Sequence, residues 1–211
     1  MIRNKLAELL AERKLKISWV AAQLPNLSRN TITSTASNKG KMIQLETINT
    51  LCQYLDISPS DFFEYLPFDI SCDVNISKNE TSSSDTDVKN ILIKQHSIEF
   101  DFFIKLETVD NKPIIFEYTG SNLSQNYWGK DLIFKLDKND TSDFGNVWSH
   151  KITPGFQAVI WNDFKQKIAD TINDSMTKKF SSHSSYFKFQ IRSNSIRLSM
   201  DFYDDVFNID F

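Results

Sequence analysis

The hydrophobic pattern of this 211-residue chain changes from a helical to a strand period between residues 66 and 98, and this change limits the possible folds more than any other feature. Up to residue 66, apolar side chains recur every three or four positions, which is the spacing of one face of an α-helix. From residue 98 to residue 107 they alternate, as in a strand with one buried face: Ile98, Phe100, Phe102, Ile104 and Leu106. A single secondary-structure element cannot bury apolar side chains at both spacings. The chain is therefore predicted to contain a helical domain followed by a sheet-containing domain.

Residues 1–68 are predicted to form an all-α domain of four to five helices. Apolar stripes at helical spacing run from Ile2 to Arg13 and from Leu45 to Leu55. Between them, Pro25 ends one short helix and Ser28 caps the next. The run Ser58–Asp61 supplies a cap, a proline at the first helical position and an acid three residues after the cap. The short final helix is predicted to carry Phe62, Phe63 and Leu66.

The rest of the chain is predicted to be a linker and a separate α+β domain. Residues 69–89 are dominated by Ser, Asp, Asn and Thr, which favours a flexible linker. Residues 90–211 are predicted to form an antiparallel sheet and one long helix. The predicted strands cover residues 98–107, 114–119 and 132–136, with a closing hairpin over 186–192 and 196–202. The helix is predicted to start after Thr153-Pro154 and to run from Phe156 to Ile172.

Positive charge gathers at the amino-terminal end of a chain whose net charge is -3. Residues 1–41 carry eight Lys and Arg against two Glu, whereas residues 42–68 carry four acids and no base. A cationic face on an otherwise acidic protein is typical of a DNA-contacting surface. The alternative interpretation is a set of scattered, solvated lysines.

Several blocks within residues 2–67 resemble the lambda-repressor-like helix-turn-helix domain of the Cro/CI-type, or XRE, family. The blocks are Lys5–Arg13, Val20–Ala21, Leu27–Ile32, Leu45–Ile48 and Asp56–Phe63. The resemblance implies that residues 28–37 form the recognition helix, which such domains place in the major groove of duplex DNA.

The resemblance also implies roles for individual residues. Base reading is expected of Arg29, Asn30, Thr33 and Ser34. Arg donates two hydrogen bonds to guanine, Asn pairs with adenine, and Ser or Thr bonds to either base or touches a thymine methyl. Phosphate contacts are expected of Ser28, Thr31, Asn38, Lys39 and Lys41. Ile32 is expected to face the core, and a solvated helix face remains the alternative interpretation of each polar residue.

Residues 90–211 contain no pattern typical of an enzyme. Phage-type relatives with a self-cleaving peptidase domain need a serine with a lysine downstream, and no lysine follows Ser199. The three histidines are too scattered for metal-ligand spacing. Asp204 and Asp205 are expected to point to opposite sides of a strand end and to be solvated. We therefore predict no catalytic residue, no metal site and no cofactor.

The sequence carries no signal for export or membrane insertion. Its first residues are charged and amphipathic, unlike a signal peptide, and no apolar run reaches the roughly 18 residues that span a bilayer. Cys52 and Cys72 lack zinc-ligand spacing and are expected to be reduced and unreactive. A cytoplasmic protein that does not contact a membrane is predicted.

The leading functional prediction is a sequence-specific DNA-binding transcription regulator, a phage or mobile-element type repressor that acts as a homodimer on a double-stranded DNA operator. One recognition helix reads only about four or five base pairs, so useful specificity needs two copies. Residues 90–211 would then dimerise or sense a signal.

Two further roles stay open for residues 90–211. Aromatic residues could wall a pocket for a small-molecule inducer, although core packing is the favoured interpretation: Tyr118, Tyr127, Trp128, Trp148, Phe156 and Trp161. The alternative function is an antitoxin-like regulator that binds a protein partner through its acidic, aromatic residues 202–211. The other interpretation of that segment is a final strand of the chain's own sheet.

Overall fold

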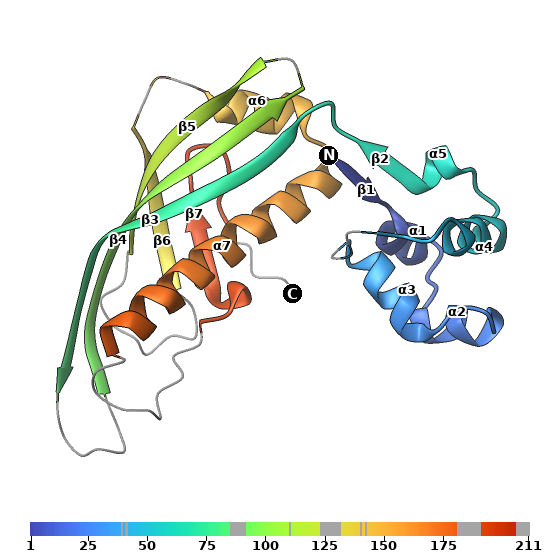
Figure 1. Cartoon of the computed structure of the whole chain (residues 1–211), viewed down its shortest axis with the longest axis horizontal. Helices are drawn as coiled ribbons and strands as arrows, with labels where there is room; N and C mark the ends of the chain where they lie inside the picture. The colour runs from blue at the N-terminus through green and yellow to red at the C-terminus, as the bar shows by residue number, and fades with distance from the viewer. Residues whose placement is uncertain are drawn as a thin grey trace. The chain divides into compact units, whose positions relative to one another are not determined.

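The computed structural model describes residues 1–38, 40, 42–84, 92–109, 111–122, 132–139, 141, 143–180 and 191–205 (Figure 1). The chain divides into two compact units, Met1–Pro67 and Phe68–Phe211, which we call the amino-terminal unit and the carboxy-terminal unit. The first is mainly helical. The second combines a sheet with helices.

The described part of the amino-terminal unit has five helices around one apolar core. They are α1 (Leu6–Glu12), α2 (Ile17–Gln23), α3 (Arg29–Ala36), α4 (Leu45–Leu55) and α5 (Pro59–Phe62). The side chains with no exposed surface come from all five helices: Leu6, Val20, Ile32, Leu51 and Phe62. Leu6 and Leu51 belong to the two predicted apolar stripes, whereas Leu45, which begins the second stripe, is exposed.

The unit is not all-α, because its two ends form a small antiparallel sheet. Ile2–Asn4 is strand β1 and Phe63–Tyr65 is strand β2, with Arg3 opposite Glu64. The predicted helix from Ile2 was wrong, as was the extension of the last helix beyond Phe62. In β1 the apolar Ile2 is exposed while Arg3 is buried, so polar contacts of the ribbon, and not an apolar helix face, decide this conformation.

The carboxy-terminal unit contains a five-stranded sheet in the order β3-β4-β5-β6-β7 among its described residues. The strands are β3 (Asp69–Ser84), β4 (Leu92–Thr108), β5 (Asn111–Asn122), β6 (Leu132–Lys138) and β7 (Ile196–Ser199). The first four pair antiparallel, but β7 pairs parallel to β6. The predicted fully antiparallel sheet was therefore wrong at this edge. A parallel neighbour needs a long crossover connection, and the helices between β6 and β7 supply it.

The predicted linker was wrong for residues 69–84, which form the edge strand β3 paired with β4. Ile70 and Val74 are buried on one face, whereas Ser71 and Asn75 are exposed on the other. A strand at an edge with a solvated outer face is rich in polar residues. The many polar residues of β3 therefore obscured the alternation of buried and exposed side chains in the sequence. Residues 85–89 lie outside the described residues.

Two helices follow β6. The first, α6 (Phe144–Lys151), was not predicted. The second, α7 (Pro154–Phe180), contains the predicted long helix and lies along one face of the sheet (Figure 1). Its apolar stripe is buried as the helical spacing predicted: Phe156, Ile160, Phe164, Ile168 and Ile172.

The structure describes only part of the segment predicted to form the closing hairpin. Residues 193–195 form a 3-10 turn, β7 spans only four residues, and residues 186–190 lie outside the described residues. After β7 the chain turns back, and the backbone N–H of Asp205 donates to the carbonyl of Leu198 at 3.1 Å.

The aromatic residues considered for an inducer pocket are core wherever the structure describes them. Tyr118, Trp148, Phe156 and Trp161 are all at most 5% exposed. Tyr127 and Trp128 lie outside the described residues. Phe202 joins this aromatic core, with its ring 5.1 Å from that of Phe144 and 5.3 Å from that of Trp148.

Asp204 and Asp205 point to opposite sides as predicted, but only Asp204 is solvated. One carboxylate oxygen of Asp205 accepts from Trp161 Nε1 and Lys165 Nζ, each at 2.9 Å, and the other accepts from Leu198 N at 2.6 Å. Asp205 is 5% exposed and Lys165 is 9% exposed. The predicted solvated Asp205 was wrong, because its two side-chain partners come from a helix at least 40 residues away in the sequence.

Candidate nucleic-acid interface

Helices α2 and α3 are joined by a short turn and share the core of the amino-terminal unit. Within the turn, Leu27 is buried and its N–H donates to the carbonyl of Leu24 at 2.9 Å. Ser28 follows in an extended conformation, and its side-chain oxygen accepts from the N–H of Thr31 at 3.0 Å. This cap satisfies one of the free N–H groups at the start of a helix. The predicted cap and the predicted helix over residues 28–37 are confirmed.

The two sides of α3 differ in burial. Ile32 is 0% exposed and Thr35 is 7% exposed, so both face the core. The four residues expected to read bases all lie on the exposed side: Arg29, Asn30, Thr33 and Ser34. Positions separated by three or four residues share one face of a helix. The arrangement therefore brings two side chains of the first turn and two of the second to the same solvent-exposed surface.

The hydroxyl groups on this surface are bonded to the backbone of α3 itself. Thr33 Oγ1 donates to the carbonyl of Arg29 at 2.9 Å, and Ser34 Oγ donates to that of Thr31 at 3.0 Å. Each hydroxyl proton is thereby engaged, while the oxygen keeps its lone pairs for a second partner. Thr33 and Ser34 present hydrogen-bond acceptors to the solvent.

The residues expected to contact phosphate are placed unequally. Ser28 is the cap, and its hydroxyl lies 2.8 Å from that of Thr31 in the first turn of α3. Asn38 follows the end of α3 and is half-buried. Lys39 and Lys41 lie outside the described residues.

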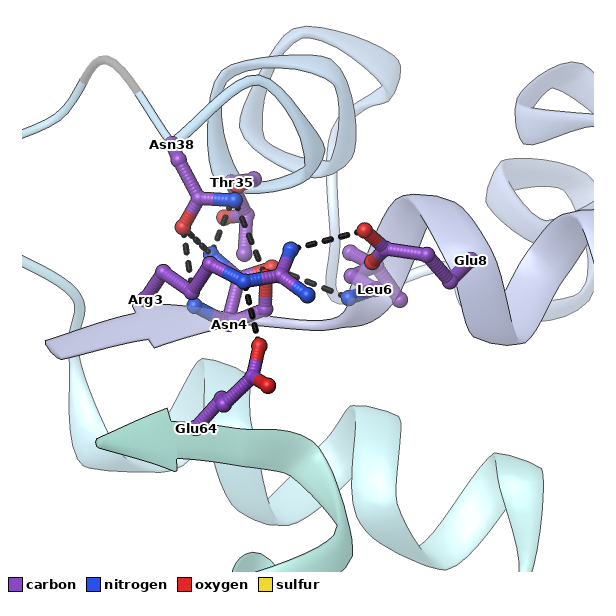
Figure 2. A network of polar contacts seen from close by, with 7 residues as sticks. All are labelled: Arg3, Asn4, Leu6, Glu8, Thr35, Asn38 and Glu64. Atoms are coloured by element: carbon purple, nitrogen blue, oxygen red, sulfur yellow. Dashed lines mark hydrogen bonds and ion pairs between the residues drawn. The ribbon is translucent and has the colours of Figure 1, made fainter. Parts of the chain in front are cut away.

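Asn38 is bonded to strand β1 through Asn4, as Figure 2 shows. Asn38 Oδ1 accepts from Asn4 N and from Asn4 Nδ2, both at 2.8 Å, while Asn38 Nδ2 donates to the carbonyl of Asn4 at 2.9 Å. Asn4 Nδ2 also donates to the carbonyl of Thr35 at 2.8 Å. Sequence reasoning missed Asn4, because a pair of amides 34 residues apart leaves no periodic pattern.

Beside this pair, Arg3 forms two ion pairs (Figure 2). Its Nε lies 2.5 Å from Glu64 Oε2 and its Nη1 lies 2.7 Å from Glu8 Oε1. Arg3 is only 7% exposed. One of the eight basic residues counted in the sequence is therefore buried and neutralised within the unit. In contrast, Lys14, Lys16 and Arg29 are exposed.

Residues 5–67 match the sequence model of the Cro/C1-type helix-turn-helix DNA-binding domain. This segment is a Cro/C1-type helix-turn-helix domain. The resemblance inferred from the sequence blocks is confirmed. A DNA-binding role in transcription regulation follows from this domain, and domains of this family are generally not enzymes.

Other comparisons add little. The crystal structure of a provisionally assigned DNA-binding protein from Bacteroides fragilis is 28% identical, over 30% of this chain and 100% of that one. Its TM-score of 0.28 carries no argument about the fold. No curated protein matches the chain.

None of the helices that the structure describes is both long and apolar enough to cross a membrane. Within the same residues, His, Cys, Asp and Glu side chains form no group of three or more that could hold a metal ion.

Proposed function

We propose that this protein is a sequence-specific transcription regulator that reads the major groove of DNA with α3. The observation that carries the proposal is the two-sided burial of this helix. Ile32 and Thr35 anchor one side in the core, while Arg29 and three further polar side chains stand on the opposite, exposed side. A helix fixed along one side and polar along the other is suited to enter a groove and bond to base edges.

The chemistry of the four residues limits the bases that they can read. Arg29 is suited to the O6 and N7 acceptors of guanine, and Asn30 to the N6 and N7 of adenine. Thr33 and Ser34 present acceptors, because their protons are engaged in α3. Adenine and cytosine offer an amino group in the major groove, whereas guanine and thymine offer a carbonyl at the equivalent position. We therefore expect adenine or cytosine opposite Thr33 and Ser34.

We further propose that the regulator is a repressor of the phage or mobile-element type that binds as a homodimer. A single short reading helix per chain supports it, since two helices about one helical turn apart are needed to select a useful site. The carboxy-terminal unit has its own apolar core and is the part of the chain that we propose dimerises. Analytical ultracentrifugation should find two chains on a palindromic duplex. One chain per duplex, with a monomer in free solution, would contradict the dimer.

Substitution of Arg29 tests base reading. Arg29→Ala should weaken binding to a selected site by about 1–3 kcal/mol and relax the preference at one base pair, because a bidentate contact to guanine is lost. Binding to random duplex DNA should change much less. Lys16→Ala is the matched control: it also removes one exposed positive charge, but from outside α3. An equal loss of affinity for both duplexes in Arg29→Ala would contradict the base-reading role of Arg29.

Among residues 202–205, the described part of the acidic, aromatic segment, no contact favours docking of a protein partner. Phe202 packs in the aromatic core of its own unit, and Asp205 bonds to Trp161 and Lys165. Residues 206–211 lie outside the described residues.

A further inference from the structure

We propose that Asn4 and Asn38 form a latch that fixes the carboxyl-terminal end of α3, and that this latch is required for sequence-specific binding. The inference rests on the proposed function, in which α3 reads the major groove. Both asparagines then act as positioning residues, because they hold the reading helix and contact no base themselves.

The latch connects β1 to the end of α3 through four hydrogen bonds. Three join Asn38 to Asn4, and the fourth runs from Asn4 Nδ2 to the carbonyl of Thr35 in the last turn of α3. Asn4 is 2% exposed, so its polar groups have little access to replacement partners in water. Loss of a bond that leaves a buried donor or acceptor unsatisfied is more costly than loss of an exposed one.

Apolar packing provides less restraint at this end of the helix, where Ala36 packs against the core but is only partly buried. A hollow of about 230 Å³ is lined by Ser34, Thr35 and Asn38 on the α3 side and by Asn4 among the residues on the β1 side. Farther back in α3, the side chain of Ile32 is completely buried. The middle of the helix is therefore held by the core, whereas its end combines partial packing with hydrogen bonds across a partly open hollow.

The composition of α3 makes this restraint important. The helix has only eight residues, and five of them are Ser, Thr or Asn, which are weak helix formers. Base reading requires side chains such as Thr33 and Ser34 to be placed accurately against base edges, whereas attraction to phosphates does not depend on sequence. A loose helix end must be ordered again at each specific binding event. Loss of the latch should therefore weaken specific binding more than non-specific binding.

The backbone at Asn38 allows a clean substitution. Its φ of 53° lies in the left-handed region, which glycine adopts without strain. Asn38→Gly therefore removes the amide and keeps the backbone conformation. Ser58→Ala is the matched control, because Ser58 caps α5 in the same unit and has no bond to α3. The control lowers stability without opening the latch.

The test measures binding of the full chain to a selected duplex and to a random duplex at one salt concentration. We expect Asn38→Gly to raise the Kd for the selected duplex about tenfold and to change that for the random duplex less than about twofold. Ser58→Ala should leave both values unchanged at a temperature where the chain is fully folded. Hydrogen exchange provides a readout without DNA: the last amides of α3 should exchange faster in Asn38→Gly, while those of α4 should not.

Several results would overturn the latch. The first is an Asn38→Gly variant that binds the selected duplex with wild-type affinity. The second is an equal loss of affinity on both duplexes, which would assign Asn38 to phosphate contact. A loss of the same size in Ser58→Ala would show that affinity follows stability alone. If the wild-type chain itself prefers no sequence, the proposed function fails instead. Hydrogen exchange then still tests whether the latch exists. The latch is refuted if the amides at the end of α3 stay protected in Asn38→Gly.

Discussion

The two units of this chain use buried polar groups for different purposes. In the amino-terminal unit, Asn4 and Arg3 are buried at the edge of a small core, where they tie a two-stranded ribbon to the helices. In the carboxy-terminal unit, the ion pair of Lys165 and Asp205 lies against a large aromatic core and ties the end of the chain to α7. The first arrangement is the one that we propose orients the reading surface. The second joins the end of the described chain to the aromatic core.

Of the changes that distinguish the two units, Asp205→Asn is expected to have the largest effect, which is a loss of stability. It leaves the Lys165 charge buried and uncompensated, which costs about 3–5 kcal/mol of unfolding free energy. Urea unfolding followed by tryptophan fluorescence reports on this unit, because Trp148 and Trp161 are buried within it. Asp204→Asn is the control at an exposed carboxylate. Equal stability losses for the two variants would contradict the role of the buried ion pair.

A smaller effect, confined to the reading surface, is expected from Thr33→Val. The substitution keeps the shape of the side chain but replaces the hydroxyl acceptor with a methyl group. The preference for adenine or cytosine at the facing position should fall by about 1 kcal/mol, roughly fivefold in relative affinity, and thymine should gain through its methyl contact. Competition binding with duplexes that differ at this one position measures the change. An unaltered order of bases would show that the hydroxyl of Thr33 reads none of them.

The smallest effect concerns chemical reactivity. Burial raises the pKa of the Cys72 thiol to about 12, and burial with the nearby Asp61 carboxylate also raises the pKa of Cys52. A raised thiol pKa keeps the reactive thiolate scarce until the pH approaches that value. Native protein at pH 8 should therefore react only slowly with iodoacetamide, and labelling should rise with pH and in urea. Rapid labelling of either cysteine in the native chain would mean that its unit opens readily.

Sequence reasoning succeeded where a structure depends on neighbours along the chain. The Ser28 cap, the capping box from Ser58 to Asp61 and the start of α7 at Pro154 all follow from local hydrogen bonding or a fixed φ. The family resemblance, and not helical spacing, indicated the residues expected to read bases; they are exposed on α3 and Ile32 is buried, while their contact with bases stays a prediction.

It failed where the deciding partner is distant in the sequence. Strand β3 is polar on its outer face and is recognisable only beside β4, and β7 takes its parallel direction from β6. Asn4 meets Asn38 across 34 residues, and Asp205 meets Lys165 across 40. Such contacts arise from the packing of whole elements, and no local pattern encodes them.

Selection from a pool of random duplexes tests the central claim most directly. With the full wild-type chain, the account predicts enrichment of a motif with two half-sites about one helical turn apart, each containing a guanine whose preference disappears in the Arg29→Ala variant. A folded chain that enriches no sequence even at low salt, where phosphate attraction is strongest, would contradict it.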